Sequence, residues 1–249
     1  MLFLIAEEII SDCLEFADVA LVVDVSGSIE GNGKYPGRFN KYIKWFLKTF
    51  VKGLHVASGR VQVGMVTFGN SGHLEFGLTS DLDKVIGKIE LYDYKGQSNT
   101  NTSGGIEVMR TQLLSSKDPN YRPNSAHIAV VVTDGASNLD KDKTITSAKN
   151  ARNDKIILLG IGVTKEVNLD ELTGIATPLI AFDKTSLEKG IKTGAIALSG
   201  TVAYVPEIEG LNYGVVDQLV THFKKTVCTT SKLVITSFIR LFKKINIVS

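Results

Sequence analysis

Residues 20–23 form a short apolar run that stops at an acidic residue. The run, ALVV, is unbroken and ends in two β-branched residues, which is typical of a strand covered on both faces in a parallel sheet. Asp24, Ser26 and Ser28 follow at alternate positions, and Gly27 allows the backbone to turn tightly. Their oxygens are the hard ligands that Mg²⁺ or Mn²⁺ prefers, although an ordinary Asp/Ser/Gly turn explains the string at least as well.

Two more apolar runs repeat this form further along the chain. Residues 126–133 (AHIAVVVT) end at Asp134, and residues 155–163 (KIILLGIGV) form a third buried strand. Segments with helical periodicity lie between the runs, the clearest being residues 39–54, whose apolar side chains share one face while lysines take the other. Strands that alternate with helices predict a doubly wound α/β fold, with a mostly parallel central sheet and helices on both faces.

One pair of strands departs from this parallel order. Residues 60–68 (RVQVGMVTF) and 73–78 (HLEFGL) are separated only by the turn-forming string GNSG. So short a link between two strands favours an antiparallel hairpin. The sheet is therefore predicted to carry one antiparallel edge strand.

Composition limits the chain to one domain with short extensions. Its 249 residues, 43% of them hydrophobic, can bury a full core as one α/β domain, whereas two domains would be cramped. The formal net charge of +2 gives no reason to expect a nucleic-acid partner. No apolar run is long enough to form a transmembrane segment, and the apolar start is too short to be a convincing signal peptide.

Two cysteines, Cys13 and Cys228, flank nearly everything that has the pattern of a folded domain. Neither has a C-x-x-C neighbour or a metal-type spacing to histidine, so zinc or thioredoxin chemistry is a poor explanation. We predict that the two are joined by a disulfide, which would close a very long loop, stabilise the fold by roughly 5 kcal/mol in the chain-entropy model and imply an oxidising compartment. Two unrelated buried thiols are the alternative.

The acidic residues Asp24 and Asp134 are expected to face one crevice. In open sheets of this type, sites form outside the carboxyl ends of the strands, and each of these residues lies where a strand ends. Two carboxylates in one place repel each other unless a cation lies between them. The polar string at residues 92–103 precedes a helix that must pack back on the sheet, so a hydroxyl near Thr100 is expected at the same edge.

Together these pieces resemble the von Willebrand factor type A domain. The strings DVSGS at residues 24–28, NTNT at residues 99–102 and TDG at residues 133–135 stand in that family's order, and resemble its metal-ion-dependent adhesion site (MIDAS). The resemblance covers about residues 17–175 and 200–228. The chain resembles extracellular matrix members of the family, such as the matrilins and collagen VI, more than intracellular members. Several extracellular members share the flanking cysteines.

The resemblance implies a binding module rather than an enzyme. One Mg²⁺, or Mn²⁺, would be held by Asp24, Ser26, Ser28, Thr100 and Asp134, some of them directly and some through water. One coordination position would stay open for an Asp or Glu side chain of an extracellular matrix protein such as collagen. The implied location is extracellular, in a secreted protein that can hold neighbouring modules of the same kind.

Two segments depart from the family pattern. Residues 179–199 stand between elements that the family joins more directly, and they are expected to be an insertion peripheral to the core or retained non-coding sequence. Residues 229–249 form a C-terminal tail, which fits a membrane-surface or partner helix, a frayed extension or an altered reading of the terminus. The predicted boundaries are residues 1–16 for an N-terminal extension and 17–228 for the domain.

Two other functions remain as alternatives. A structural matrix module would bind its partners without the metal, because membership in a family does not guarantee use of its site. A metal-dependent hydrolase would also place strand-end carboxylates on Mg²⁺. Against the hydrolase, Asp24 is followed two residues later by Ser26 rather than by a second acid, and no lysine lies in an obvious phosphate-binding motif.

Overall fold

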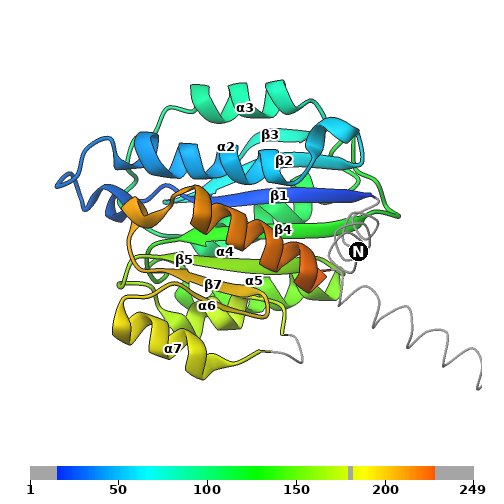
Figure 1. Ribbon diagram of the computed structural model, residues 1–249. Helices are drawn as coiled ribbons and strands as arrows, with labels where there is room; N and C mark the ends of the chain where they lie inside the picture. Colours follow the sequence, from blue (N-terminus) through cyan, green and yellow to red (C-terminus); the bar gives the residue numbers. More distant parts are fainter. Residues whose placement is uncertain (1–15, 179–181, 228–249) are drawn as a thin grey trace, which may run out of the picture.

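Within the residues that the structure describes, 16–178 and 182–227, the computed structural model has a central sheet of seven strands in the order β3-β2-β1-β4-β5-β7-β6 (Figure 1). The middle strand β1 (Ala17–Asp24) pairs in parallel with β2 (Val61–Phe68) on one side and β4 (Ala126–Thr133) on the other. Every residue of β1 is buried, as the unbroken apolar run predicts. The sheet continues in parallel from β4 through β5 (Ile157–Val163) to β7 (Val202–Val205).

Both edges of the sheet are antiparallel. The predicted hairpin is confirmed, because β3 (Gly72–Thr79) follows β2 after a short turn and pairs with it in the antiparallel sense. At the opposite edge, β6 (Ala197–Ser199) pairs antiparallel with β7. The doubly wound, mostly parallel fold is therefore confirmed, and the structure adds a second antiparallel edge that the sequence did not predict.

Helices cover both faces of the sheet (Figure 1). Alternate residues of β1 point to opposite faces, so Leu21 enters one core and Val22 the other. The core that contains Leu21 is covered by α2 (Lys44–Gly53), α3 (Leu82–Leu91) and a helix at residues 213–227. The core that contains Val22 is covered by α4 (Thr102–Val108), α5 (Lys141–Asn153) and α6 (Leu169–Ile175). Shorter helical turns are η2 (Gly27–Glu30), η3 (Phe39–Ile43), η4 (Val56–Ser58), η5 (Met109–Leu113) and η6 (Ile208–Gly210).

The segment before β7 contributes to the core, which corrects the expectation that residues 179–199 are peripheral to it. The helix α7 (Lys184–Thr193) buries Leu187 completely, in a cluster that also holds Leu172 of α6 and Tyr204 of β7. This cluster closes the β6 edge of the sheet. That the segment is an insertion stays a prediction, and its residues 179–181 lie outside the described ones.

Several expectations fall outside the part of the chain that the structure describes. Residues 1–15 and 228–249 are among these, so the pairing of Cys13 with Cys228 and the nature of the C-terminal tail stay predictions. Within residues 16–178 and 182–227, none of the helices combines the length and the apolar character that a membrane crossing requires.

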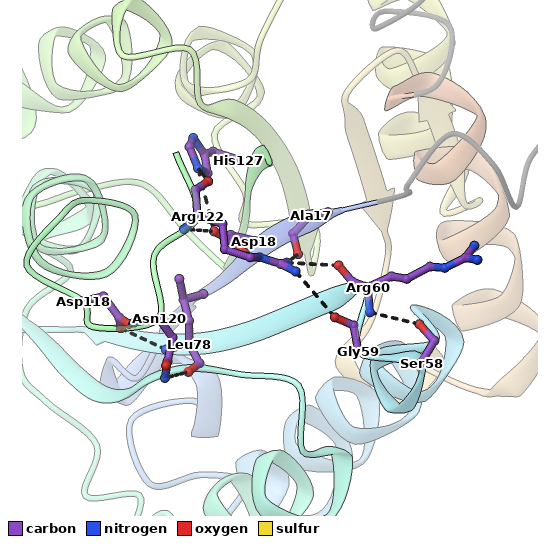
Figure 2. A network of polar contacts seen from close by, with 10 residues as sticks. All are labelled: Ala17, Asp18, Ser58, Gly59, Arg60, Leu78, Asp118, Asn120, Arg122 and His127. Carbon is purple, nitrogen blue, oxygen red and sulfur yellow. Dashed lines mark hydrogen bonds and ion pairs between the residues drawn. The ribbon is translucent and has the colours of Figure 1, made fainter. Parts of the chain in front are cut away.

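A buried ion pair closes the end of β1 that is remote from Asp24 (Figure 2). Asp18 is fully buried and accepts hydrogen bonds from the backbone N–H of Arg122 at 2.9 Å and from its Nε at 2.8 Å. The Arg122 guanidinium also donates to the carbonyl oxygens of Ala17 at 2.7 Å and Arg60 at 3.0 Å. One arginine thus joins the starts of β1 and β2 to the loop before β4.

Candidate metal centre

β1 ends at Asp24, at the edge of the sheet where the parallel strands have their carboxyl ends. The side chain is buried and both of its oxygens are held in place. Oδ1 accepts a hydrogen bond from the backbone N–H of Ser26 at 2.9 Å, and Oδ2 accepts one from the Thr133 hydroxyl at 2.7 Å. Because Thr133 is the last residue of β4, this bond ties two neighbouring strands together where the loops that carry the predicted ligands begin.

A chain of hydroxyl groups leads from Ser26 to Asp134. The two oxygens Ser26 Oγ and Ser28 Oγ lie 2.8 Å apart, and the Ser28 hydroxyl donates to Asp134 Oδ1 at 2.8 Å. Ser26 and Asp134 are buried, whereas Ser28 is partly exposed. The structure therefore brings four of the five predicted ligands, Asp24 included, into one cluster at the sheet edge.

The fifth predicted ligand, Thr100, lies in the loop before α4 and is held by its backbone. Its N–H donates to Asn138 Oδ1 at 2.9 Å, and its carbonyl oxygen accepts from the N–H groups of Asn138 at 3.1 Å and Leu139 at 3.4 Å. Among the described residues, no hydrogen bond engages the Thr100 hydroxyl. The nearby Thr102 hydroxyl, by contrast, lies 2.8 Å from the Ser137 hydroxyl. Of these two threonines, Thr100 is the one whose hydroxyl is left available to a ligand.

α4 begins close against β3 because two glycines meet there. A Cβ atom added to Gly72 would lie 2.2 Å from the carbonyl oxygen of Gly104, so only glycine allows this approach. Asn101 caps the helix by accepting the Gly104 N–H on its Oδ1 at 2.8 Å. The packing fixes where α4 starts, and with it the position of the loop that carries Thr100.

The loop that carries Ser26 is held by residues outside the three motif strings. Gln97 pairs with it like a short parallel strand, donating its N–H to the Val25 carbonyl at 3.0 Å and accepting the Gly27 N–H at 2.7 Å. The Tyr94 hydroxyl donates to the Ser26 carbonyl at 2.7 Å. Nothing in the local sequence marks Gln97 or Tyr94 for this task, because their partners are distant in the chain.

Burial and mutual repulsion act on the two carboxyl groups of the cluster. Burial is the larger cause at Asp134, the negative charge of Asp24 adds to it, and together they raise the pKa of Asp134 to about 7. Burial also raises the pKa of Asp24, against the opposing hydrogen bonds from Ser26 and Thr133. A divalent cation would offset the cost of burial and the repulsion between the two carboxylates, because it favours the charged form of both groups.

The donor set fits a small, hard cation. It offers two carboxylates and three hydroxyls, which are the oxygen ligands that Mg²⁺ and Mn²⁺ take. In the described part of the chain no group of three or more His, Cys, Asp and Glu side chains could hold a metal, so a cation here would depend on the hydroxyl oxygens. Arg38, a cation whose charge reaches Asp134, is paired with Glu209 at 2.8 Å.

Comparison with known proteins gives a family match for most of the chain. The family model for the von Willebrand factor type A domain matches residues 18–191. The chain is 32% identical to integrin alpha-2 of Mus musculus over 77% of its length, and 29% identical to the collagen alpha-6(VI) chain of Mus musculus over 64%. It spans 15% and 7% of the lengths of these two relatives.

Solved structures share the fold at lower sequence identity. Proximal thread matrix protein 1 from the mussel byssus has a TM-score of 0.66 and 22% identity, over 86% of this chain and 47% of that one. A second structure of that protein, with its MIDAS motif occupied by zinc, has a TM-score of 0.64 and 21% identity, over 86% and 46% of the two chains. The family match covers most of the described residues and the strand-end cluster lies inside it, so the chain belongs to the von Willebrand factor type A domain family.

Proposed function

We propose that this chain is an extracellular adhesion or matrix-interaction module that binds a protein partner through a metal ion held at its MIDAS. The observation that carries the proposal is the cluster in which Asp24 and Asp134 meet the hydroxyls of Ser26 and Ser28 at one end of the sheet. Membership in a family that includes integrin alpha-2 and collagen VI chains supports a role in adhesion or matrix assembly.

The proposed ligands are Asp24, Ser26, Ser28, Thr100 and Asp134, and the proposed cation is Mg²⁺, with Mn²⁺ as a substitute. When bound, the cation supplies an electrophilic position for a carboxylate of the partner. Two of the five proposed ligands, Asp24 and Asp134, carry a negative charge, and together they balance a divalent cation without exceeding it. A third carboxylate, from an Asp or Glu of the partner, is therefore not repelled by excess negative charge at the site.

The proposed activity is binding rather than catalysis. A hydrolase on this scaffold would need a nucleophile or a general base beside the metal. The position two residues after Asp24 is Ser26, whose hydroxyl lies in the chain that leads through Ser28 to Asp134. These side chains are proposed to orient and fill a coordination sphere, and no bond is made or broken in the partner.

Binding assays against immobilised collagen and a panel of purified matrix proteins test the proposal. We expect binding in the presence of Mg²⁺ and its loss in EDTA. Asp134→Ala and Thr100→Ala should each weaken binding more than about tenfold, because each removes one proposed oxygen ligand. Far-UV circular dichroism should stay unchanged, and the melting temperature of the metal-free Asp134→Ala variant should stay the same or rise, because removing one of two facing acids relieves repulsion.

Asp93→Ala is a matched control for the loss of a carboxylate. Asp93 belongs to the neighbouring loop, and its side chain is 80% exposed beside Lys95. This variant should bind like the wild type. Binding that survives both EDTA and Asp134→Ala would overturn the metal bridge and favour a structural module whose partners dock elsewhere.

A further inference from the structure

The loop after Asp134 is anchored at a buried serine. Ser137 is 3% exposed, its backbone N–H donates to Glu171 Oε1 at 2.9 Å, and its hydroxyl donates to the same oxygen at 2.7 Å. The hydroxyl also lies 2.8 Å from the Thr102 hydroxyl and 3.0 Å from the Thr144 hydroxyl. Side chains of α4, α5 and α6 therefore converge on this one residue.

Glu171 is itself fixed in place on the first turn of α6. Its backbone N–H donates to the Oδ1 atom of the helix-capping residue Asn168 at 2.9 Å. The helix then packs its buried residues Leu172 and Ile175 against the sheet, and Ile175 belongs to the second core. The carboxylate that holds Ser137 thus projects from a well-packed element.

The anchored loop leads directly to the predicted metal ligand Thr100. Asn138, the residue after Ser137, holds both backbone groups of Thr100, and Leu139 holds the Thr100 carbonyl as well. Hydrogen bonds from Glu171 to Ser137 and from Asn138 to Thr100, joined by the peptide bond between Ser137 and Asn138, therefore link Glu171 to the segment that carries the free Thr100 hydroxyl.

We propose that Glu171 is a positioning residue for the metal site, which acts by holding Ser137 so that Asn138 sets the position of Thr100 relative to Asp134. The proposal rests on the metal site of the proposed function and adds a residue that lies outside the three motif strings. Mg²⁺ demands near-ideal geometry from its ligands, so a loop that can drift loses affinity. Replacing a residue that orients a metal ligand typically costs 10- to 100-fold in metal affinity.

Variants of Glu171 separate geometry from charge. Glu171→Gln keeps an oxygen that accepts the Ser137 N–H and hydroxyl, and it removes only the negative charge. Glu171→Ala removes the acceptor. If the role is positioning, the affinity for Mn²⁺ should fall roughly 10- to 100-fold in Glu171→Ala and stay within about threefold of the wild type in Glu171→Gln.

The measurement is Mn²⁺ binding to the full chain by electron paramagnetic resonance, with Mg²⁺ titration by calorimetry as a second probe. Asp170→Ala is the matched control, because Asp170 is the adjacent acid on α6 but pairs with Lys184 on the surface, and its side chain is 83% exposed. That variant should bind Mn²⁺ like the wild type. Circular dichroism confirms that each variant is folded at the temperature of the titration.

A double variant tests whether Glu171 and Asn138 act through the same loop. Asn138→Ala alone should also weaken Mn²⁺ binding, because it frees the Thr100 N–H. If Glu171 works through the same loop, Glu171→Ala combined with Asn138→Ala should lose less affinity than the product of the two single losses. Ser137→Ala, which keeps the backbone N–H bond to Glu171, replaces Glu171→Ala if that variant does not fold.

The outcomes distinguish this inference from the proposed function. Mn²⁺ that binds the wild type but binds Glu171→Ala equally well overturns the positioning role alone. A Glu171→Gln variant as weak as Glu171→Ala also overturns it and assigns the effect to charge. A wild-type chain that binds neither Mn²⁺ nor Mg²⁺ overturns the metal site and, with it, this inference.

Discussion

The Asp134 carboxyl group links the proposed metal site to the stability of the fold. Its pKa is raised to about 7, first by burial and then by the charge of Asp24. In the unfolded chain, an aspartate titrates near 3.9. At this group the folded, metal-free protein therefore binds more protons than the unfolded chain between about pH 4 and about pH 7, so the contribution of Asp134 to stability falls as the pH rises through this window.

Asp134→Asn should remove the fall in stability that ionisation of Asp134 causes as the pH rises. We expect the free energy of unfolding of the metal-free variant to decline less than that of the wild type between pH 4 and pH 7, because the amide does not ionise. Urea unfolding in EDTA at a series of pH values measures the difference between the two proteins. Asp93→Asn, at an exposed carboxylate, should leave the wild-type slope unchanged. A variant whose slope equals that of the wild type would contradict the raised pKa.

At the scale of elements, β1 carries a buried aspartate near each end, and the two have opposite surroundings. Asp18 is paired with Arg122, whose guanidinium lies 2.7 Å from Asp18 Oδ1. Asp24 is held by a backbone N–H and a hydroxyl instead. The first arrangement neutralises the buried charge with a guanidinium, whereas the second leaves a carboxylate that we propose binds a cation. One strand thus has an ion pair at one end and the proposed metal site at the other.

Asp18→Asn should destabilise the protein without weakening metal binding. Removing one partner of a buried ion pair costs about 3 to 5 kcal/mol. We expect about 3 kcal/mol here, because the Arg122 side chain is 23% exposed and water can compensate part of the lost charge. Urea unfolding measures the loss, and Mn²⁺ titration of the folded variant should match the wild type.

Asp154→Asn provides the control for that variant. Asp154 pairs with Arg110, but its side chain is 51% exposed, so the change should cost less than about 1 kcal/mol. Equal losses in the two variants would show that burial of Asp18 contributes nothing beyond an ordinary surface pair.

Across the whole molecule, three clusters of buried apolar side chains pack against the sheet. Two of them lie on the two faces of the sheet, and the third, which contains Leu187, lies where α6 and α7 meet β7. The third cluster protects the β6 edge. It shares α6 with the network around Ser137, because Leu172 and Glu171 are adjacent residues of that helix.

Leu187→Ala should cost about 2 to 5 kcal/mol of stability, because a fully buried leucine would leave a cavity. Lys189→Ala, an exposed change on the same helix, should leave the free energy of unfolding within about 0.5 kcal/mol of the wild type. Thermal and urea unfolding measure both. A Leu187→Ala variant as stable as the wild type would restore the expectation that residues 179–199 are peripheral.

Elements with a local pattern could be predicted from the amino-acid sequence alone. The unbroken run before Asp24 predicts a buried central strand, and the structure confirms it. The short GNSG link predicts the antiparallel β3 edge, and the three motif strings predict which loops meet at the carboxyl ends of the strands. These features can be predicted without knowing the distant contacts, because apolar alternation, turn residues and strand ends each depend on residues that are close together in the sequence.

The side chains that support the predicted ligands could not be predicted, because they come from segments far apart in the chain. Gln97 and Tyr94 clamp the Ser26 loop, and Glu171 holds Ser137, across gaps of 34 or more residues. An isolated glutamine, tyrosine or glutamate at a loop or helix end carries no local pattern that reveals such a partner. The short β6 strand escaped prediction for the same reason, since three residues gain strand geometry only by pairing with β7. Local sequence pattern thus specifies the helices and strands, whereas contacts between distant segments specify how the proposed metal site is supported.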